Sequence, residues 1–536
     1  MSKRKPEYKP LLFTTTVRNP SRLKGLLNIF SKFNNEILTD ELAEKVMGEL
    51  IRYGLYRPTK DISPTIIKKW GGKRISEKSN IGKIILNDQE IRFILKNNIQ
   101  SHKEADFRVG WPSRFATEFD FAKELGFVFY VPKQKIIFSD IGLKLSDAVE
   151  IKVENDSIFM TETHPELEQQ AFLQALVKYQ RNNPFVRVKN ENAPLLLLFE
   201  VITKLNMDKE FNDTGISKLE IPLIIFWKDN NSENLYQLIK KLRKDYGYNP
   251  SPEVIIDICI NKIMEGNFKK FDPKSILIDY PDEFIRKMRI TGLISLRGAG
   301  RFIDINKKEQ VKVDYILNNY SNYKKYKTEK DYFEYMAKVD QNLFVEEKQL
   351  INSDEVDKFL SKWSTVYAWD NLKNELTILS QRSLTKDGIL KYIPNSVRLE
   401  FLTALAIKSR FPKIKVVPNY IYDDEGLPTS TAPGVGDSGD IECYENTNGV
   451  LIEVTMSEGR IQTVAEVWPI ARHLETFIKK RKDSICYFVA PSIFTDSIRQ
   501  INYVKKEDNL DIVPKTIEDF LDYIEKAKLL YIKPSN

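Results

Sequence analysis

The stretch "GDIECYENTNGVLIEVTM", residues 439–456, places acidic side chains on two short apolar segments that flank a turn. Successive side chains of a strand point to opposite faces, so Glu453 shares one face with Leu451 and Thr455. The residues on either side of Glu453 are apolar, which is typical of a buried strand. A lone carboxylate in such a strand is costly, and the pattern therefore predicts a cationic partner for Glu453.

A hairpin at this turn supplies a second acid. Asp440 stands at the start of the first segment, and the turn contains Asn446, Asn448 and Gly449. Antiparallel pairing of the two segments brings Asp440 and Glu453 within reach of one ion. Two close carboxylates repel each other unless a hard cation joins them, and Mg²⁺ binds a few carboxylate oxygens together with water and phosphate. We therefore expect an Mg²⁺ site, which can activate a water and stabilise the leaving oxygen when a phosphodiester bond is broken.

The sequence around this stretch predicts a small α/β domain. An apolar helix follows Ile393, strands are expected around Val416, Ile441 and Ile452, and a helix is expected from about Gln462. A further strand is expected at "SICYFVAP".

The spacing of the two acids resembles that of the PD-(D/E)xK nuclease core, with two departures. Gly439 stands where that motif has proline, and Thr455 stands where it has lysine. Because Thr455 carries no positive charge, another group or a second metal ion would have to help orient the water.

Two further acids are candidates for the same site. Glu400 lies in the helix "NSVRLEFLTALAIKSRF", whose apolar stripe places it at the border of the core. Glu466 lies shortly before Pro469, where a kink or a new helix start is expected. An exposed surface position is the alternative for each of them.

Composition excludes several classes of protein. The chain has 536 residues, 42% of them hydrophobic, which suits several domains with separate cores. Three cysteines and three histidines lie far apart, so a disulfide framework or a zinc site is not expected. The opening "MSKRKPEYKP" lacks the apolar core of a signal peptide, and no apolar run reaches about 18 residues. We expect a soluble protein of a reducing compartment.

The positive charge is concentrated near the N-terminus. The net charge is +7, and residues 1–60 hold 12 basic against 6 acidic residues. Such a basic region suits contacts with phosphate groups, although an ordinary solvated surface explains the charge equally well.

A helix followed by a strand recurs three times before residue 310. The first helix starts at Thr39 and ends at Gly54, the second ends at Gly126, and the third ends near Gly292. Turns at residues 132–134 and 298–300 predict hairpins after the second and third helices. Helix plus hairpin suggests winged-helix-like modules, which place a helix in the major groove of DNA. The alternative is a module that contacts only other proteins.

The middle of the chain is rich in Tyr, Lys and Asn, as in "NNYSNYKKYKTEKDYFEYMAKVD", and predicts a helical linker. The expected fold is thus a multidomain chain, α/β plus α. It comprises a DNA-recognition region of winged-helix-like modules at residues 1–310, a linker at 311–385, and a PD-(D/E)xK-like nuclease domain at 386–536.

DNA contacts are expected from basic and aromatic residues beside the predicted helix starts and hairpins. Arginine pairs bidentately with guanine, but at least half of protein–DNA contacts go to the backbone. The candidates are Arg18, Arg22, Lys24, Arg108, Trp111, Arg114, Arg289, Arg297 and Arg301. Packing is the alternative for Trp111.

The opening "KPLLFTTTVRNPSRLKGLLNIFSKFNNEILTDELAEKVMGELIRYGLYRP" and the C-terminal order E…D…EVT…E…RH…FVAP resemble the AlwI family of type IIS restriction endonucleases. The resemblance implies N-terminal recognition and a C-terminal Mg²⁺-dependent nuclease that cuts at a fixed distance outside a short asymmetric site. It also implies that Asp440, Glu453 and Glu400 bind the metal and that Glu466 belongs to the catalytic group. Thr455 matches a threonine of the family itself, so it too is a candidate catalytic residue.

Two other functions stay open beside double-strand cleavage. One is strand-specific nicking, because cutting both strands requires two nuclease sites and hence a transient homodimer. The other is a winged-helix DNA-binding protein without catalysis. The expected partner is double-stranded DNA, with a cognate methyltransferase that acts on the same site rather than binding the enzyme, in the cytoplasm of a prokaryote.

Overall fold

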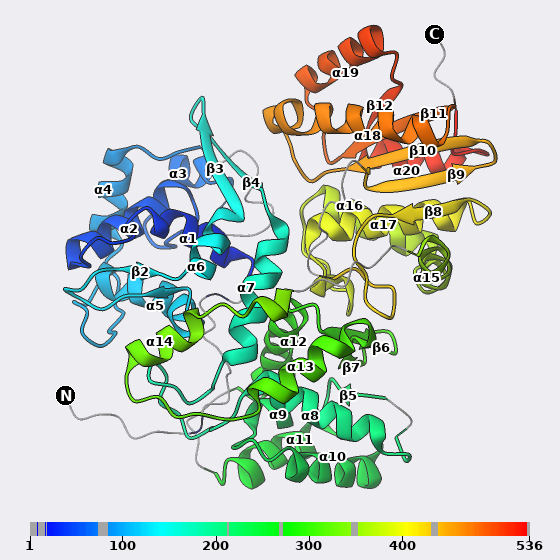
Figure 1. Ribbon diagram of the computed structural model, residues 1–536. Coiled ribbons are helices and arrows are strands. Elements are labelled where there is room, and N and C mark those ends of the chain that lie inside the picture. The colour runs from blue at the N-terminus through cyan, green and yellow to red at the C-terminus, as the bar shows by residue number, and fades with distance from the viewer. Residues whose placement is uncertain are drawn as a thin grey trace. The chain divides into compact units, whose positions relative to one another are not determined.

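The computed structural model describes residues 8, 17, 19–72, 84–211, 214–266, 272–344, 352–429 and 438–532 (Figure 1). The described chain forms two compact units, one built from the residues up to 344 and the other from residue 352 onward.

The first unit is mainly helical, with three small antiparallel sheets. Its strands are β1 (Val128–Phe129), β2 (Ile137–Phe138), β3 (Val149–Glu154), β4 (Ser157–Glu162), β5 (Ile216–Ser217), β6 (Ile294–Arg297) and β7 (Phe302–Ile305). Its α-helices are α1 (Arg22–Ser31), α2 (Asp40–Arg52), α3 (Pro64–Lys69), α4 (Asp88–Asn97), α5 (Trp111–Glu124), α6 (Asp140–Asp147), α7 (Pro165–Lys178), α8 (Pro194–Met207), α9 (Ile221–Phe226), α10 (Ser232–Tyr246), α11 (Pro252–Asp257), α12 (Tyr280–Arg289), α13 (Gln310–Tyr320) and α14 (Glu329–Ala337).

Aromatic packing joins the helices at the start of this unit. The ring of Phe30 in α1 lies 5.0 Å from that of Phe115 and 4.4 Å from that of Phe119, both in α5. Such pairs contribute about 0.5–1.5 kcal/mol each beyond the burial of their area. The N-cap of α2 is Thr39, as predicted, whose Oγ1 accepts a hydrogen bond of 3.1 Å from the Leu42 N–H.

The second and third predicted helix–hairpin junctions are confirmed. Helix α5 is followed by the antiparallel pair β1–β2, and α12 is followed by β6–β7. Gly126, at the second junction, has a φ of +74°, and a Cβ there would lie 2.3 Å from the Cβ of Met336. Only glycine fits this turn without strain.

The first predicted junction is wrong in its second half, because no strand follows α2 within the described residues 53–63. The N–H groups of Leu55 and Tyr56 both donate to the Leu50 carbonyl. This closes the end of the helix instead of opening an extended chain, and Pro58 has no N–H to offer a partner strand.

The second unit is a three-layer α/β structure. Its sheet has the order β12-β11-β10-β9-β8; β8, β9 and β10 pair antiparallel, and β10, β11 and β12 pair parallel. The strands are β8 (Lys415–Pro418), β9 (Ile441–Glu445), β10 (Asn448–Val454), β11 (Ser484–Ala490) and β12 (Ile512–Thr516). The α-helices are α15 (Ser353–Val366), α16 (Trp369–Ser380), α17 (Asn395–Arg410), α18 (Val467–Lys480), α19 (Thr495–Asp508) and α20 (Ile517–Lys526). The predicted α/β character of this region is confirmed.

Each face of this sheet is covered by helices (Figure 1). On one face, Leu451 of β10 packs with Val467 and Leu474 of α18 and with Val504 of α19 in a single buried cluster. On the other face, Tyr487 of β11 contacts the rings of two aromatic residues of α20. The sheet is therefore buried on both sides, which explains the nearly continuous apolar sequence of β11.

The helices of the predicted linker divide between the two units. Helices α13 and α14 belong to the first unit, and α15 and α16 belong to the second. The boundaries at residues 310 and 385 and the roles assigned to the three regions stay predictions.

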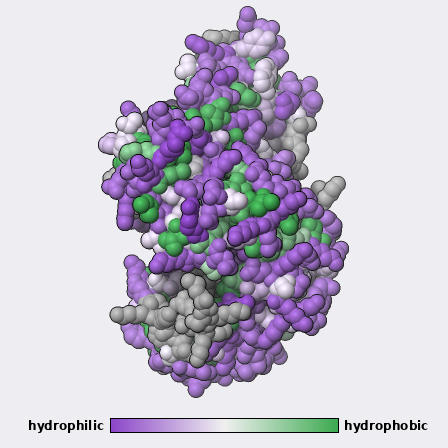
Figure 2. Space-filling view, turned by 90° about the vertical axis from the view of Figure 1, so that its left-hand side faces the viewer, coloured by the Kyte–Doolittle hydropathy of each residue, from purple (hydrophilic) through white to green (hydrophobic). Residues whose placement is uncertain are grey.

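No helix in the described part of the chain is long and apolar enough to cross a membrane. Figure 2 shows a face of the molecule on which hydrophilic side chains predominate and hydrophobic residues form scattered groups.

Candidate active site

The pairing of β9 with β10 brings the two acids of the opening stretch together. In the observed register Ile441 lies opposite Ile452, so the next pair along the strands is Asp440 opposite Glu453. Directly opposite residues lie on the same face of a sheet. Oδ2 of Asp440 accepts a hydrogen bond of 2.8 Å from the Val454 N–H, which anchors the carboxylate beside Glu453.

Gly439 allows the chain to pass close to this pair of acids. A Cβ at this position would lie 2.2 Å from Oε1 of Glu453 and 2.6 Å from Cδ1 of Leu451. Any side chain here would displace the Glu453 carboxylate, so glycine has a steric reason at this position.

Glu453 has one direct partner that could carry a positive charge, His473. The side chain of Glu453, in β10, is almost fully buried. Nδ1 of His473, in α18, lies 2.9 Å from Oε1 of Glu453. The predictions from sequence did not include His473. The "RH" of the family-like pattern falls on it, and that pattern is the signal that could have identified it.

The neighbouring acids repel one another. Burial raises the pKa of Asp440 well above its ordinary value, and the charges of Glu453 and Glu466 raise this pKa further, whereas the Val454 N–H lowers it. Burial likewise raises the pKa of Glu453, and the charges of Glu466 and Glu400 add to that effect. The pKa of Glu400 is raised by burial and by Asp440. Four carboxylates therefore share one electrostatic neighbourhood, in which each raises the pKa of one or more of the others.

Glu400 reaches this neighbourhood from α17. It is part-buried on a helix whose remaining residues are largely enclosed, so the predicted position at the border of the core is confirmed.

Glu466 reaches the site through a π-helical turn. The turn spans Gln462–Glu466 and leads directly into α18, which contains Pro469 in its first turn. Oε1 of Glu466 accepts a hydrogen bond of 2.9 Å from the hydroxyl of Thr455. The same hydroxyl oxygen accepts from the Ser457 N–H at 3.0 Å. The direction of Glu466, left open by the sequence, is thus toward Thr455 and the acids.

The donor chemistry of these residues fits a hard cation. Within the described ranges, no group of three or more His, Cys, Asp or Glu side chains is placed so that it could hold a metal ion. A cation of the Mg²⁺ type does not need three protein ligands, because it binds through one or two carboxylates and keeps water and phosphate as its other ligands. Asp440, which is part-buried, and Glu453, which is buried, supply two carboxylates on the same face of the sheet.

The sequence pattern of a known family covers most of the chain. The model of the AlwI restriction endonuclease family matches residues 123–393 and 351–523. This chain belongs to that family. Membership of a restriction endonuclease family implies hydrolysis of DNA. No curated protein sequence matches the chain.

Solved structures of restriction endonucleases show a weak likeness to this AlwI family member. The small subunit R.BspD6I2 of the heterodimeric restriction endonuclease R.BspD6I is 22% identical, over 30% of this chain and 78% of that one, with a TM-score of 0.25. Restriction endonuclease FokI is 12% identical over 97% and 96% of the two chains, with a TM-score of 0.23. FokI bound to DNA is 12% identical over 94% and 93%, with a TM-score of 0.21.

In this family member, several predicted DNA-contact residues are engaged inside the first unit. The ammonium of Lys24 pairs with Glu162 at 2.5 Å and Glu168 at 3.2 Å. Trp111 is buried and donates from Nε1 to the Leu95 carbonyl at 2.9 Å, so the packing alternative holds for it.

Four of the predicted arginines also bind protein groups. Arg22 donates to the Leu55 carbonyl at 3.3 Å, and Arg289, which is 2% exposed, donates to the Ile294 carbonyl at 2.8 Å. The remaining contacts are those of Arg114 with Glu118 and His102, and of Arg297 with Asp304.

Two of the predicted arginines expose most of their charge to solvent. Arg108 has a side-chain exposure of 57% and weak ion pairs with Asp40 and Glu44. Arg301 is exposed and is the last residue of the β6–β7 turn. Arg18 lies outside the described residues. DNA contact by any of these residues stays a prediction.

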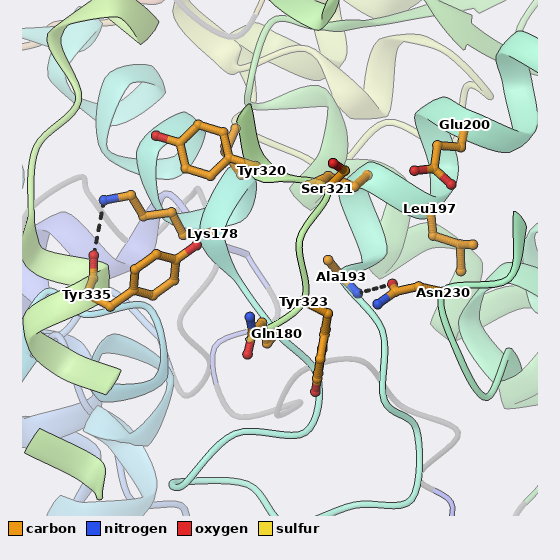
Figure 3. A pocket seen from close by; sticks show the side chains of 12 residues that line it. Lys178, Gln180, Ala193, Leu197, Glu200, Asn230, Tyr320, Ser321, Tyr323 and Tyr335 are labelled. Carbon is orange, nitrogen blue, oxygen red and sulfur yellow. Dashed lines mark hydrogen bonds between the residues drawn. The ribbon is translucent and has the colours of Figure 1, made fainter. Parts of the chain in front are cut away.

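A separate pocket lies in the first unit. It has a volume of about 70 Å³, and Tyr320, Tyr323 and Tyr335 are among its lining residues (Figure 3). The Lys178 ammonium at its edge donates to the Tyr335 carbonyl at 3.1 Å and also to the Lys338 carbonyl. Burial lowers the pKa of Lys178 to about 8. None of the acids described above lines this pocket.

Proposed function

We propose that this AlwI family member is a type IIS endonuclease whose second unit is a PD-(D/E)xK-like nuclease that uses Mg²⁺. The observation that carries the proposal is the placement of the part-buried Asp440 opposite the buried Glu453, with His473 as the cationic partner that the described residues give Glu453. Asp440 and Glu453 would hold the ion, and Glu400 would add its negative charge beside Asp440. Bound Mg²⁺ supplies the positive charge that activates a water and stabilises the leaving oxygen of a phosphodiester.

The chain's own residues then orient the reacting groups. His473 holds Glu453 through Oε1, and the Val454 N–H holds Asp440 through Oδ2, so each acid keeps one carboxylate oxygen for the ion. Glu466 stands in for the missing lysine: one of its oxygens binds the Thr455 hydroxyl, and the other is available to accept a proton from the attacking water.

The first unit would locate the DNA. The α5–β1–β2 and α12–β6–β7 arrangements suit winged-helix-like modules, in which a helix enters the major groove and a hairpin contacts the backbone. Arg108 and Arg301 are the predicted contact residues whose charges reach solvent. With recognition and cleavage in different units, the cut falls at a fixed distance outside a short asymmetric site.

Strand-specific nicking is the second candidate. The proposed nuclease site occurs once in the described residues, and a duplex has two strands. Cleavage of both strands therefore requires two chains in a transient homodimer or two successive nicks. A dependence of linear product on protein concentration would indicate the homodimer.

The test compares Asp440→Ala with a matched acid on the same face of β9. Glu442 is buried, and its carboxylate is bound by Lys480 at 2.8 Å and by the Tyr444 hydroxyl at 2.5 Å. We expect Asp440→Ala to abolish Mg²⁺-dependent cleavage of plasmid DNA while binding in EDTA is retained. Glu442→Gln should keep cleavage. Unchanged cleavage in Asp440→Ala would remove Asp440 from the mechanism, and binding without any cleavage by the wild type would favour a non-catalytic DNA-binding protein.

A further inference from the structure

Asn419, the first residue after β8, clamps the chain that leads into Asp440. Its N–H donates to the Asp440 carbonyl at 2.9 Å, and its Nδ2 donates to the Gly439 carbonyl. Asn419, which follows β8, thus holds the consecutive carbonyls of Gly439 and Asp440, which precede β9.

These bonds complete the fixation of Asp440. The Val454 N–H holds the side chain of Asp440 on one side, and Asn419 holds its backbone on the other. Because both the backbone and one carboxylate oxygen are fixed, the remaining freedom of this carboxylate is small.

The clamped peptide also borders the second acid. Gly439 passes so close to Glu453 that a Cβ would lie 2.2 Å from Oε1. A shift of the peptide held by Asn419 therefore moves Asp440 directly and changes the space available to Glu453.

Tyr420, the residue after Asn419, packs beside α17. Tyr420 is 1% exposed, and its pKa is raised by burial and by the nearby charge of Glu400. Its ring lies 6.1 Å from that of Phe401, the residue after Glu400. The dipeptide 419–420 is therefore packed between the elements that carry Asp440 and Glu400.

We propose that Asn419 is a positioning residue of the nuclease site and sets its affinity for the divalent ion. The proposal rests on the proposed function above. Groups that orient metal ligands typically change metal affinity by about 10- to 100-fold when they are removed.

The test measures binding of Mn²⁺ to the full chain without DNA, from the electron paramagnetic resonance signal of the free ion. Mn²⁺ shares the preference of Mg²⁺ for carboxylate and water oxygens. We expect Asn419→Ala to weaken binding by about 10-fold and to raise the Mg²⁺ concentration for half-maximal cleavage by a similar factor. If Asn419→Ala lowers Tm, the nearly isosteric Asn419→Leu takes its place with the same expectation.

The control is Trp363→Phe, which removes a side-chain bond from α15 to the backbone of Glu425. Nε1 of Trp363 donates to the Glu425 carbonyl at 2.8 Å, away from residues 439 and 440. This variant should bind Mn²⁺ as the wild type does. Wild-type affinity in both Asn419 variants, or an equal loss in Trp363→Phe, overturns the role of Asn419. Asp440→Ala distinguishes failure of the proposed metal site from failure of the role of Asn419. If Asp440→Ala also binds Mn²⁺ normally, the metal site is not at Asp440. If only Asp440→Ala loses Mn²⁺ affinity, the metal site stands and the role of Asn419 is contradicted.

Discussion

Nδ1 of His473 lies 2.9 Å from Oε1 of Glu453, although 20 residues and a change from strand to helix separate them. The contact joins α18 to the sheet at the point where the acids gather. It gives the buried Glu453 a partner that can carry positive charge. The sequence predicted such a partner but did not identify the residue.

Removal of this contact should impair cleavage more than folding. For His473→Ala we expect a loss of about 10- to 100-fold in the single-turnover cleavage rate, since Glu453 loses the group that orients it. His473→Gln, which retains a hydrogen-bonding amide, should lose less. His164→Ala is the matched control, because His164 lies in the first unit with a side-chain exposure of 61%. Equal losses in the variants at 473 and 164 would contradict the assignment.

The crowded acids make the metal-free protein less stable as pH rises. Burial and mutual repulsion raise the pKa values of Glu400, Asp440 and Glu453 in the folded chain. Above pH of about 4 the folded chain therefore holds protons that the unfolded chain has released, and the free energy of unfolding falls as pH increases. In EDTA we expect Tm to fall as pH is raised from 5 to 8. Added Mg²⁺ should raise Tm at pH 8 and leave it unchanged at pH 5.

Neutralising one acid should relieve this repulsion. Asp440→Asn keeps an oxygen that can accept from the Val454 N–H and removes one negative charge. At pH 8 in EDTA we expect it to raise the free energy of unfolding by about 1–3 kcal/mol, measured by calorimetry, and to reduce the fall of Tm with pH. A lower Tm than that of the wild type would show that Asp440 stabilises the metal-free fold.

The Thr455 hydroxyl should matter through the group it binds. Thr455→Val removes the hydrogen bond to Glu466 at 2.9 Å and the one from the Ser457 N–H, with little change of shape. We expect the cleavage rate to fall by about 10-fold, while Thr455→Ser stays close to the wild type. A fully active Thr455→Val would mean that Glu466 needs no such support.

Two arginines near the β6–β7 hairpin should respond in opposite ways. Arg301 is exposed, so Arg301→Ala should weaken DNA binding, lower the slope of log K against log salt by about 1, and leave Tm unchanged. Arg289 is 2% exposed and donates to the Ile294 carbonyl, so Arg289→Ala should mainly lower Tm. Fluorescence anisotropy and calorimetry on both variants distinguish the two roles.

Local periodicity predicted the second unit well because its signals lie close together in sequence. The alternation around Glu453 and the turn at Gly449 define β10 and its pairing with β9, and the pairing places Asp440 opposite Glu453. The features that sequence could not supply depend on distant contacts. Lys24 looks like a basic surface residue until Glu162 and Glu168, more than 130 positions away, enclose its charge.

The direction of Glu466 was unpredictable for another reason. A proline inside a helical stretch removes one backbone N–H from the hydrogen-bond pattern, but it does not show how the chain responds. Here the response is a π-helical turn ending at Glu466, which aims this acid at Thr455.

Run-off sequencing of both strands of digested DNA tests the central claim most directly, because it reads the recognised sequence and the cut position together. The account predicts Mg²⁺-dependent ends at one constant distance outside a short asymmetric sequence, on one or both strands, and their disappearance in Asp440→Ala. Ends within the recognised sequence, ends scattered at random, or the same ends from Asp440→Ala would contradict it.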